Sequence, residues 1–88
     1  MKRRGYDLNR IAERVAEIYG METREIMSRG KQPRKVKARS LFCFWAVSEL
    51  GMSIRDVAKR LEMSPPGVGF SVARGQAIAH ENEYYLID

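Results

Sequence analysis

An unbroken apolar run near the middle of the chain constrains its fold more than any other feature. Residues 41–47 read Leu-Phe-Cys-Phe-Trp-Ala-Val. On a helix such a run is apolar on every side, and a helix of this kind is stable only when neighbouring elements surround it. We therefore predict a buried central helix over residues 34–50, ended by Gly51, which tolerates a left-handed backbone. With 88 residues, the chain is long enough for one domain, covering residues 1–88.

Two helices are predicted before the central one. Apolar residues recur at helical spacing over residues 8–19, with Asp7 as a candidate cap and Gly20 as the stop. Thr23 is expected to cap a short second helix, and Pro33 to break the chain after it.

Serine caps predict two further helices after the central one. Ser53 opens the first, and Ser64 opens the second, with Pro65 at a position where its missing N–H costs nothing. A weaker helical segment anchored by Ile78 is expected to follow. Since no segment alternates as a strand does, the sequence predicts an all-α fold, a compact bundle of about five to six helices. The inner face of the helix after Ser53 is expected to consist of Ile54, Val57, Ala58 and Leu61.

Positive charge is concentrated in one stretch of the chain. The formal net charge is +5; residues 29–39 hold six Lys or Arg and no acid, whereas residues 75–88 hold three acids and no Lys or Arg. A basic patch indicates a polyanionic partner, because each cation placed on a phosphate releases counterions. The candidate DNA contacts in this patch are Arg34, Lys35, Lys37 and Arg39.

Residues 53–75 carry the pattern of a helix-turn-helix. Its turn often contains glycine, but the position here is Glu62, which prefers a right-handed backbone, so we expect a turn of different geometry. The residues that the motif needs are present at the expected spacing: a small Ala58 in the first helix, an apolar Met63 in the turn, Ser64 as the cap and an inward Val68.

The second helix of such a motif enters the major groove with its N-terminal residues leading. These residues lack the Arg, Asn or Gln side chains that read bases best, but serine hydroxyls can bond phosphates or bases, and Pro and Phe can touch a thymine methyl group. The alternative for Phe70 is core packing. Arg74 is expected to contact a phosphate. The candidate DNA-binding residues here are Ser64, Pro65, Pro66, Gly67, Phe70, Ser71 and Arg74.

Residues 11–74 resemble the C-terminal DNA-binding domain of the bacterial replication initiator DnaA. The resemblance is carried by Ile11-Ala12, Tyr19-Gly20, Ile26-Met27-Ser28-Arg29 and, most closely, Val36-Lys37-Ala38-Arg39-Ser40-Leu41. It implies a Trp-repressor-like, all-helical domain that binds duplex DNA, with the basic loop and Arg39 beside the recognition helix. Replication initiators have Asp-His-Thr-Thr where this chain has Ser64-Pro65-Pro66-Gly67, so their origin-box specificity does not carry over. The chain also has no GxxxxGK[ST] run of an ATPase.

A second resemblance is to the C-terminal domain of REP-associated tyrosine transposases, carried by residues 38–43, 50–53 and 63–75. In that family, a DnaA-like domain follows a nuclease domain that needs two metal-binding histidines and a nucleophilic tyrosine. This chain has one histidine, so the resemblance implies the DNA-binding module without the nuclease. It also implies hairpin DNA as a further partner.

Catalytic and metal chemistry have no candidate residues in the sequence. Cys43 lies in the apolar run, and His80 follows 37 positions later, which is not a zinc-site spacing. No pair of acids sits in an apolar setting that would suit general acid–base catalysis. We therefore expect no enzyme activity, no cofactor, no metal and no small-molecule substrate. Trp45 and the pair Tyr84-Tyr85 are expected to pack against the core.

The sequence also favours a cytoplasmic location. No run approaches the roughly 18 apolar residues that span a membrane, and the basic residues near the N-terminus are not followed by an apolar signal segment. A single cysteine makes no intrachain disulfide, which fits a reducing compartment.

The leading functional prediction is sequence-specific binding of double-stranded DNA by a transposase-related or DnaA-related module. The alternative is a protein-interaction helix-turn-helix with an acidic partner, which the Pro- and Gly-rich second helix favours, whereas the charge concentrated near Arg39 favours DNA. A weaker third hypothesis is a ligand-gated switch like the Trp repressor, which requires a pocket. Neither the DNA target sequence nor the oligomeric state follows from the sequence.

Overall fold

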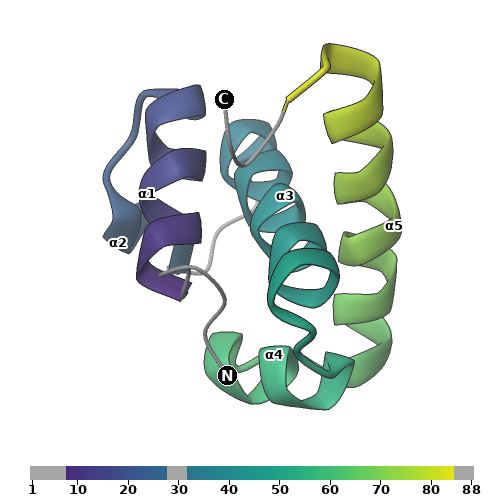
Figure 1. The fold of residues 1–88 in the computed structure, drawn as a ribbon. Helices are drawn as coiled ribbons and strands as arrows, with labels where there is room; N and C mark the ends of the chain where they lie inside the picture. Colours follow the sequence, from purple (N-terminus) through teal and green to yellow (C-terminus); the bar gives the residue numbers. More distant parts are fainter. Residues whose placement is uncertain (1–7, 28–31, 85–88) are drawn as a thin grey trace.

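Five helices make up most of the residues that the computed structural model describes, which are 8–27 and 32–84 (Figure 1). The described residues contain no strand, so the all-α prediction is confirmed. The helix count lies at the lower end of the expected five to six. In chain order the helices are α1 (Leu8–Tyr19), α2 (Thr23–Met27), α3 (Pro33–Leu50), α4 (Ile54–Leu61) and α5 (Pro65–Asn82).

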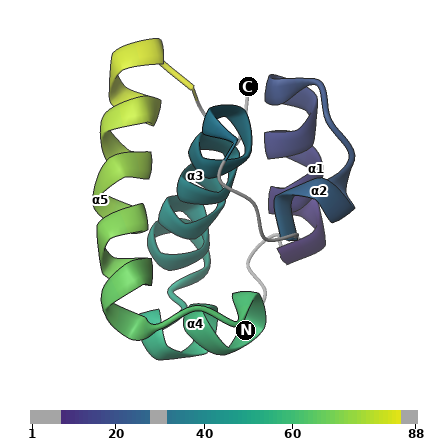
Figure 2. The ribbon, with the colours of Figure 1, turned by 180° about the vertical axis from the view of Figure 1, so that it is seen from behind.

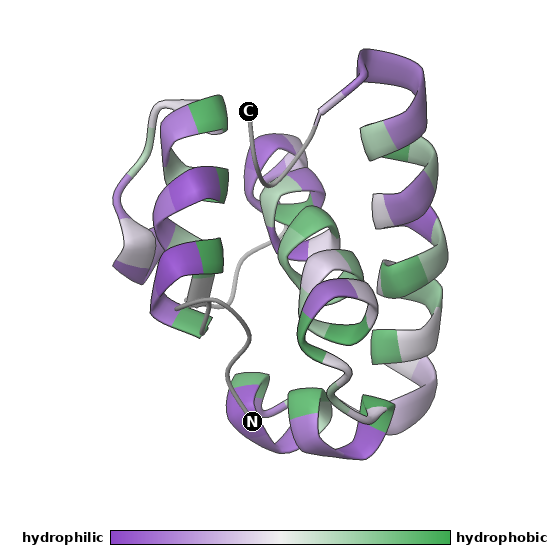
Figure 3. Ribbon diagram, in the orientation of Figure 1, coloured by the Kyte–Doolittle hydropathy of each residue, from purple (hydrophilic) through white to green (hydrophobic). Residues whose placement is uncertain are grey.

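Helix α3 is the centre of the fold and contacts all four other helices. Its apolar run is buried as predicted, with Leu41, Phe42 and Cys43 fully inaccessible and Trp45 2% exposed. Helices α1 and α2 lie on one side of α3 and α5 on the other in both views (Figures 1 and 2). The apolar residues of α1 face α3 (Figure 3), which buries them in the shared core.

Helices α3 and α5 run in opposite directions and approach each other most closely at Gly75. A Cβ added to Gly75 would overlap the carbonyl oxygen of Ser40 and lie 2.8 Å from the Cβ of Phe44. The buried Ser40 hydroxyl donates a hydrogen bond to the Val36 carbonyl of its own helix (2.8 Å). It therefore needs no hydrogen-bond partner between the two helices, which can pack closely. Only glycine allows this close approach of the two backbones.

Helix α5 is longer than the sequence predicted, because it continues without a break to Asn82. The prediction of a separate, weaker segment anchored by Ile78 is therefore wrong. Ile78 is half-buried and its neighbour Ala79 is buried, and both belong to α5. The buried positions recur every three or four residues along the whole helix, which keeps one stripe against α3. They are Val68, Ser71, Gly75 and Ala79.

The predicted serine caps are confirmed at both α4 and α5. Ser53 Oγ accepts a hydrogen bond from the Asp56 N–H (3.0 Å), and Ser64 Oγ accepts one from the Gly67 N–H (3.2 Å). Pro65 occupies the first turn of α5, where its missing N–H leaves no bond unmade.

The starts of α2 and α3 differ from prediction by one residue each. Thr23 is the first residue of α2 rather than its cap, and the Glu22 N–H is bound by the Glu25 carboxylate (2.9 Å). Pro33 does not break the chain but opens α3, a position that suits its fixed φ.

The helix ends depend on left-handed residues. Gly20 (φ 63°) and Gly51 (φ 70°) end α1 and α3 as predicted. Glu62 ends α4 with the same backbone (φ 55°, ψ 44°), so the expectation of a different turn geometry is wrong. The reason is the hydrogen bond from the Met63 N–H to the Ala58 carbonyl (2.9 Å), which closes the helix end only when the residue before it is left-handed.

The C-terminal end of α5 turns back onto α1. The ring of Tyr84 meets the ring of Tyr19 edge-on, with 6.4 Å between centroids and 68° between planes. This confirms core packing for Tyr84, while Tyr85 lies outside the described residues. Burial and the nearby Tyr84 raise the pKa of Tyr19.

Candidate nucleic-acid interface

The first two turns of α5 are exposed. Ser64, Pro65 and Pro66 are exposed and Gly67 is half-buried, while the Phe70 side chain is 73% exposed. Phe70 therefore lies on the surface and does not pack in the core. Arg74, one turn further along the helix, is also exposed.

Ser71 was predicted to contact DNA, but its side chain lies in the interior. It is 7% exposed and lies four residues before Gly75 on the stripe that packs against α3. The spacing of 3.6 residues per turn places it about 100° around the helix from Phe70, which is enough to move it from the surface to the interior. Its hydroxyl is not presented to a partner.

Two of the four α3 cations are fully exposed. These are Arg34 and Lys37, whereas Lys35 and Arg39 are half-buried. The other cations of the basic stretch, Arg29 and Lys31, lie outside the described residues.

Arg39 lies close enough to Cys43 to influence its thiol. Burial raises the pKa of Cys43 to about 12, and the positive charge of Arg39 opposes this effect only in part. The thiol is therefore protonated at neutral pH and completely buried, so the core role predicted for Cys43 is confirmed.

The antiparallel arrangement separates the two groups of candidate residues. Because Gly75 lies against Ser40 and Phe44, a rise of about 1.5 Å per residue places Arg34 and Pro65 about 25 Å apart along the helix axes. The first turn of α3 thus lies toward the C-terminal end of α5 (Figure 1). The candidate interface is an extended surface rather than one cluster.

Three further cations belong to this surface but were left out of the predicted site. Helix α4 packs on both α3 and α5, and its exposed residues include Arg55, Lys59 and Arg60. The sequence signal was available, because Arg55 and Lys59 are four residues apart and therefore share one face of the first helix of the motif.

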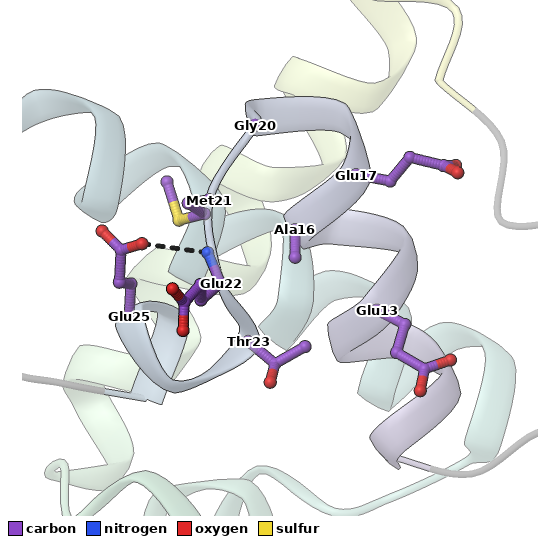
Figure 4. Close-up of a pocket in the computed structure, with 8 residues that line it drawn as sticks. All are labelled: Glu13, Ala16, Glu17, Gly20, Met21, Glu22, Thr23 and Glu25. Carbon is purple, nitrogen blue, oxygen red and sulfur yellow. Dashed lines mark hydrogen bonds between the residues drawn. The ribbon is translucent and has the colours of Figure 1, made fainter.

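The opposite side of the molecule is acidic. A wide, open depression of about 810 Å³ lies between α1 and α2, and four of its lining residues are Glu13, Glu17, Glu22 and Glu25. Their carboxylates point in different directions and do not converge on one position (Figure 4). Glu17 pairs with Arg14 (2.7 Å) and Glu22 with Arg24 (3.0 Å). With two of its four glutamates paired to arginines, this surface offers little attraction to a polyanion, and its carboxylates do not form an ion site.

The described part of the chain has neither a metal-binding cluster nor a membrane-spanning helix. No group of three His, Cys, Asp or Glu side chains is placed to hold a metal ion within residues 8–27 and 32–84. Over the same residues, no helix has both the length and the apolar character needed to cross a membrane.

Comparison with known proteins adds no assignment. No protein-family model, no curated protein and no solved structure matches this chain. Its function must therefore be inferred from the exposure, charge and packing of the residues described above.

Proposed function

We propose that this chain is a DNA-binding module, in which α4, the turn after it and α5 form a helix-turn-helix with α5 in the major groove. The observation that carries the proposal is the separation of charge. Residues 33–82, which form α3, α4 and α5, carry eight Lys or Arg and four Asp or Glu, whereas residues 8–27, which form α1 and α2, carry three Arg and four Glu, and all four Glu line the depression. A duplex is therefore attracted to the α3–α5 part more strongly than to the α1–α2 part.

The packing between α4 and α5 supports this reading of the motif. Ala58 and Val68 are buried, and Met63 in the turn is half-buried. The left-handed Glu62 and the Ser64 cap fix the direction in which α5 leaves the turn. A rigid α5 is required if its exposed residues are to enter a groove in one orientation.

The length of the surface fits one face of a duplex. The separation of about 25 Å between Arg34 and Pro65 corresponds to about seven base pairs at roughly 3.4 Å each. With the start of α5 in the major groove, cations on α3 and α4 can contact phosphates that flank it. The resemblance to DnaA-like and transposase-associated domains supports the same assignment, and hairpin DNA is a second substrate to test.

Two narrower features of the proposal follow. We assign no catalytic role to Cys43, because its thiol is buried and protonated. A free cysteine in the core suits a reducing compartment, which supports a cytoplasmic location.

The test is fluorescence anisotropy with a labelled random-sequence duplex at several salt concentrations. With about 5–7 phosphate contacts, the logarithm of the affinity should fall against the logarithm of salt with a slope of about −5 to −6. Lys37→Ala and Lys59→Ala should each weaken binding to every sequence and reduce the slope by about 1.

Arg24→Ala is the matched control. It also removes one exposed positive charge, but from the acidic side of the molecule, where Arg24 pairs with Glu22. Its slope should equal that of the wild type. Equal losses for all three variants would show that net charge, rather than a surface, governs binding.

A second candidate function is a protein-interaction module with an acidic partner. The 73% exposure of Phe70 favours it, since exposed aromatic residues anchor protein interfaces. Absence of binding to duplex and hairpin DNA at low salt would contradict the DNA proposal and favour this one.

A further inference from the structure

We propose that α5 reads thymine methyl groups in the major groove through Phe70, with Pro66 and Ala73 beside it, rather than through hydrogen bonds to base edges. This inference rests on the proposed DNA-binding function and names the feature of the duplex that is recognised. The side chains that support it share the outward face of α5.

From Pro66 to Ala77 one stripe of α5 is apolar except for one cation; exposed Gln76 lies beside this stripe, and exposed His80 and Glu81 follow it at the end of the helix. Pro66, Phe70, Ala73, Arg74 and Ala77 are all exposed and recur at intervals of three or four residues, so they form one stripe along the helix. An exposed apolar residue is ordinary when it stands alone. Here Phe70 is the large member of a continuous apolar stripe, and its side chain stays 73% exposed while the opposite stripe fills the core.

The same stripe lacks the groups that read bases by hydrogen bonding. It offers no Asn, Gln or Lys, and its one Arg lies at residue 74, more than two turns into the helix. The Ser64 hydroxyl already accepts the Gly67 N–H as the helix cap. The largest surface that this stripe offers for base discrimination is therefore the apolar side chain of Phe70.

The charges around the stripe indicate which class of partner binds to it. Residues 63–80 contain no acid, and on α4 and the turn after it, which adjoin α5, exposed Arg55, Lys59 and Arg60 outnumber exposed Asp56 and Glu62. The occupant is therefore a polyanion that carries apolar groups between its charges. In duplex DNA the thymine methyl group is the apolar group that projects into the major groove, and the minor groove has none.

Two glycines beside Phe70 differ in what they do for the fold. A Cβ at Gly67 would lie 3.1 Å from Ser64 Oγ, so that glycine accommodates the helix cap. A Cβ at Gly69 would meet nothing within 4 Å, so no packing within the chain requires a glycine there.

The experiment compares duplexes that differ in one methyl group per base pair. Binding is measured by anisotropy to an alternating A·T duplex and to the same duplex with deoxyuridine in place of thymidine. It is also measured for an alternating G·C duplex with and without 5-methylcytosine, which adds a methyl group at the same place in the groove. One buried methyl is worth about four-fold in affinity, so two contacts should favour the methylated member of each pair by about fifteen-fold.

Variants of Phe70 identify the residue that reads the methyl groups. Phe70→Ala should reduce the thymine-to-uracil ratio to about two-fold or less, and thermal unfolding should show that the fold is intact, since the side chain is exposed. Phe70→Leu should retain most of the ratio, because methyl contact needs apolar surface and not an aromatic ring. Gln76→Ala is the control on α5: Gln76 is exposed but lies off the stripe, and its ratio should stay at the wild-type value.

The contrary outcomes distinguish a failure of methyl reading from a failure of DNA binding. Salt-dependent binding with equal affinity for thymine and uracil duplexes would overturn methyl reading and leave DNA binding in place. Loss of the ratio in Phe70→Leu as well as Phe70→Ala, together with a preference for a hairpin containing unpaired bases, would replace methyl contact by stacking. No binding to any of these probes at low salt would overturn both proposals.

Discussion

Gly75 and Gly69 lie six residues apart on the same helix and have opposite environments. Gly75 is buried against the backbone of Ser40, and an added Cβ would overlap the carbonyl oxygen of that residue. Gly69 has open space where its side chain would be. Glycine in a helix interior costs roughly 1 kcal/mol relative to alanine at either position. Packing offsets that cost at Gly75, whereas nothing within the chain offsets it at Gly69.

This contrast extends to the two faces of α5. The inner stripe consists of small or β-branched residues, because the backbone of α3 lies too close for larger ones. The outer stripe carries Phe70, whose side chain is 73% exposed and is not needed for packing. A surface that the fold leaves unconstrained is the natural place for residues selected by a partner, which is why we assign the outer stripe to binding.

The largest expected effect of a substitution is that of Gly75→Ala. The new methyl group must push α3 and α5 apart, and overpacking of this kind should lower the free energy of unfolding by about 3 kcal/mol. Urea denaturation followed by circular dichroism measures it. Wild-type stability in this variant would mean that the two helices are less closely packed than described.

The buried thiol of Cys43 gives the next effect, through pH. Its pKa of about 12 in the folded chain lies above the ordinary value of 9.0, so above pH 9 the unfolded chain releases a proton that the folded chain keeps. Stability should therefore fall as pH rises from 9 toward 12, by about 1.4 kcal/mol per pH unit. The comparison is with Cys43→Ala, in which this part of the slope should be absent although the tyrosines still titrate.

Glu62→Gly should stabilise the turn before α5. A non-glycine residue at φ 55° is strained by about 1 kcal/mol, and glycine removes the strain but adds freedom to the unfolded chain. We expect a net gain of about 0.5 kcal/mol in the same urea experiment. Gly51→Ala, at a left-handed position already occupied by glycine, should change stability in the opposite direction.

Gly69→Ala should produce a small change of opposite sign to Gly75→Ala. The methyl group enters open space, so the variant should be more stable than the wild type by about 0.5–1 kcal/mol. If Gly69 allows close approach to DNA, the same variant should bind the duplex more weakly. A loss of stability at both glycines would remove the contrast on which the assignment of the two faces depends.

Local signals in the sequence predicted much of this fold. The caps Ser53 and Ser64 and the stops Gly20 and Gly51 act within one helical turn, so their positions follow from neighbouring residues alone. The burial of α3 was equally predictable, because residues 41–47 are apolar on every face. Lys37 was named from the basic patch and Phe70 from the helix-turn-helix pattern, and the structure shows that both are exposed.

Errors arose where a residue's role depends on a distant partner. Ser71 was placed on the surface because it is a serine near a helix start, yet it faces α3. Ile54 was placed on the inner face of α4 but is 39% exposed, because the helix begins there and turns it away from the core. Glu62 was expected to avoid the left-handed region, into which the closing hydrogen bond of α4 places it.

Helix boundaries, the central helix and the uneven distribution of charge were therefore encoded in local sequence, since each depends on residues within one or two helical turns. The tertiary structure alone decided that α3 and α5 meet at Ser40 and Gly75, that the α3 cations lie about 25 Å from the start of α5, and that Phe70 faces solvent. These features require two segments more than 30 residues apart to be packed together, and helical periodicity specifies a face without specifying what covers it.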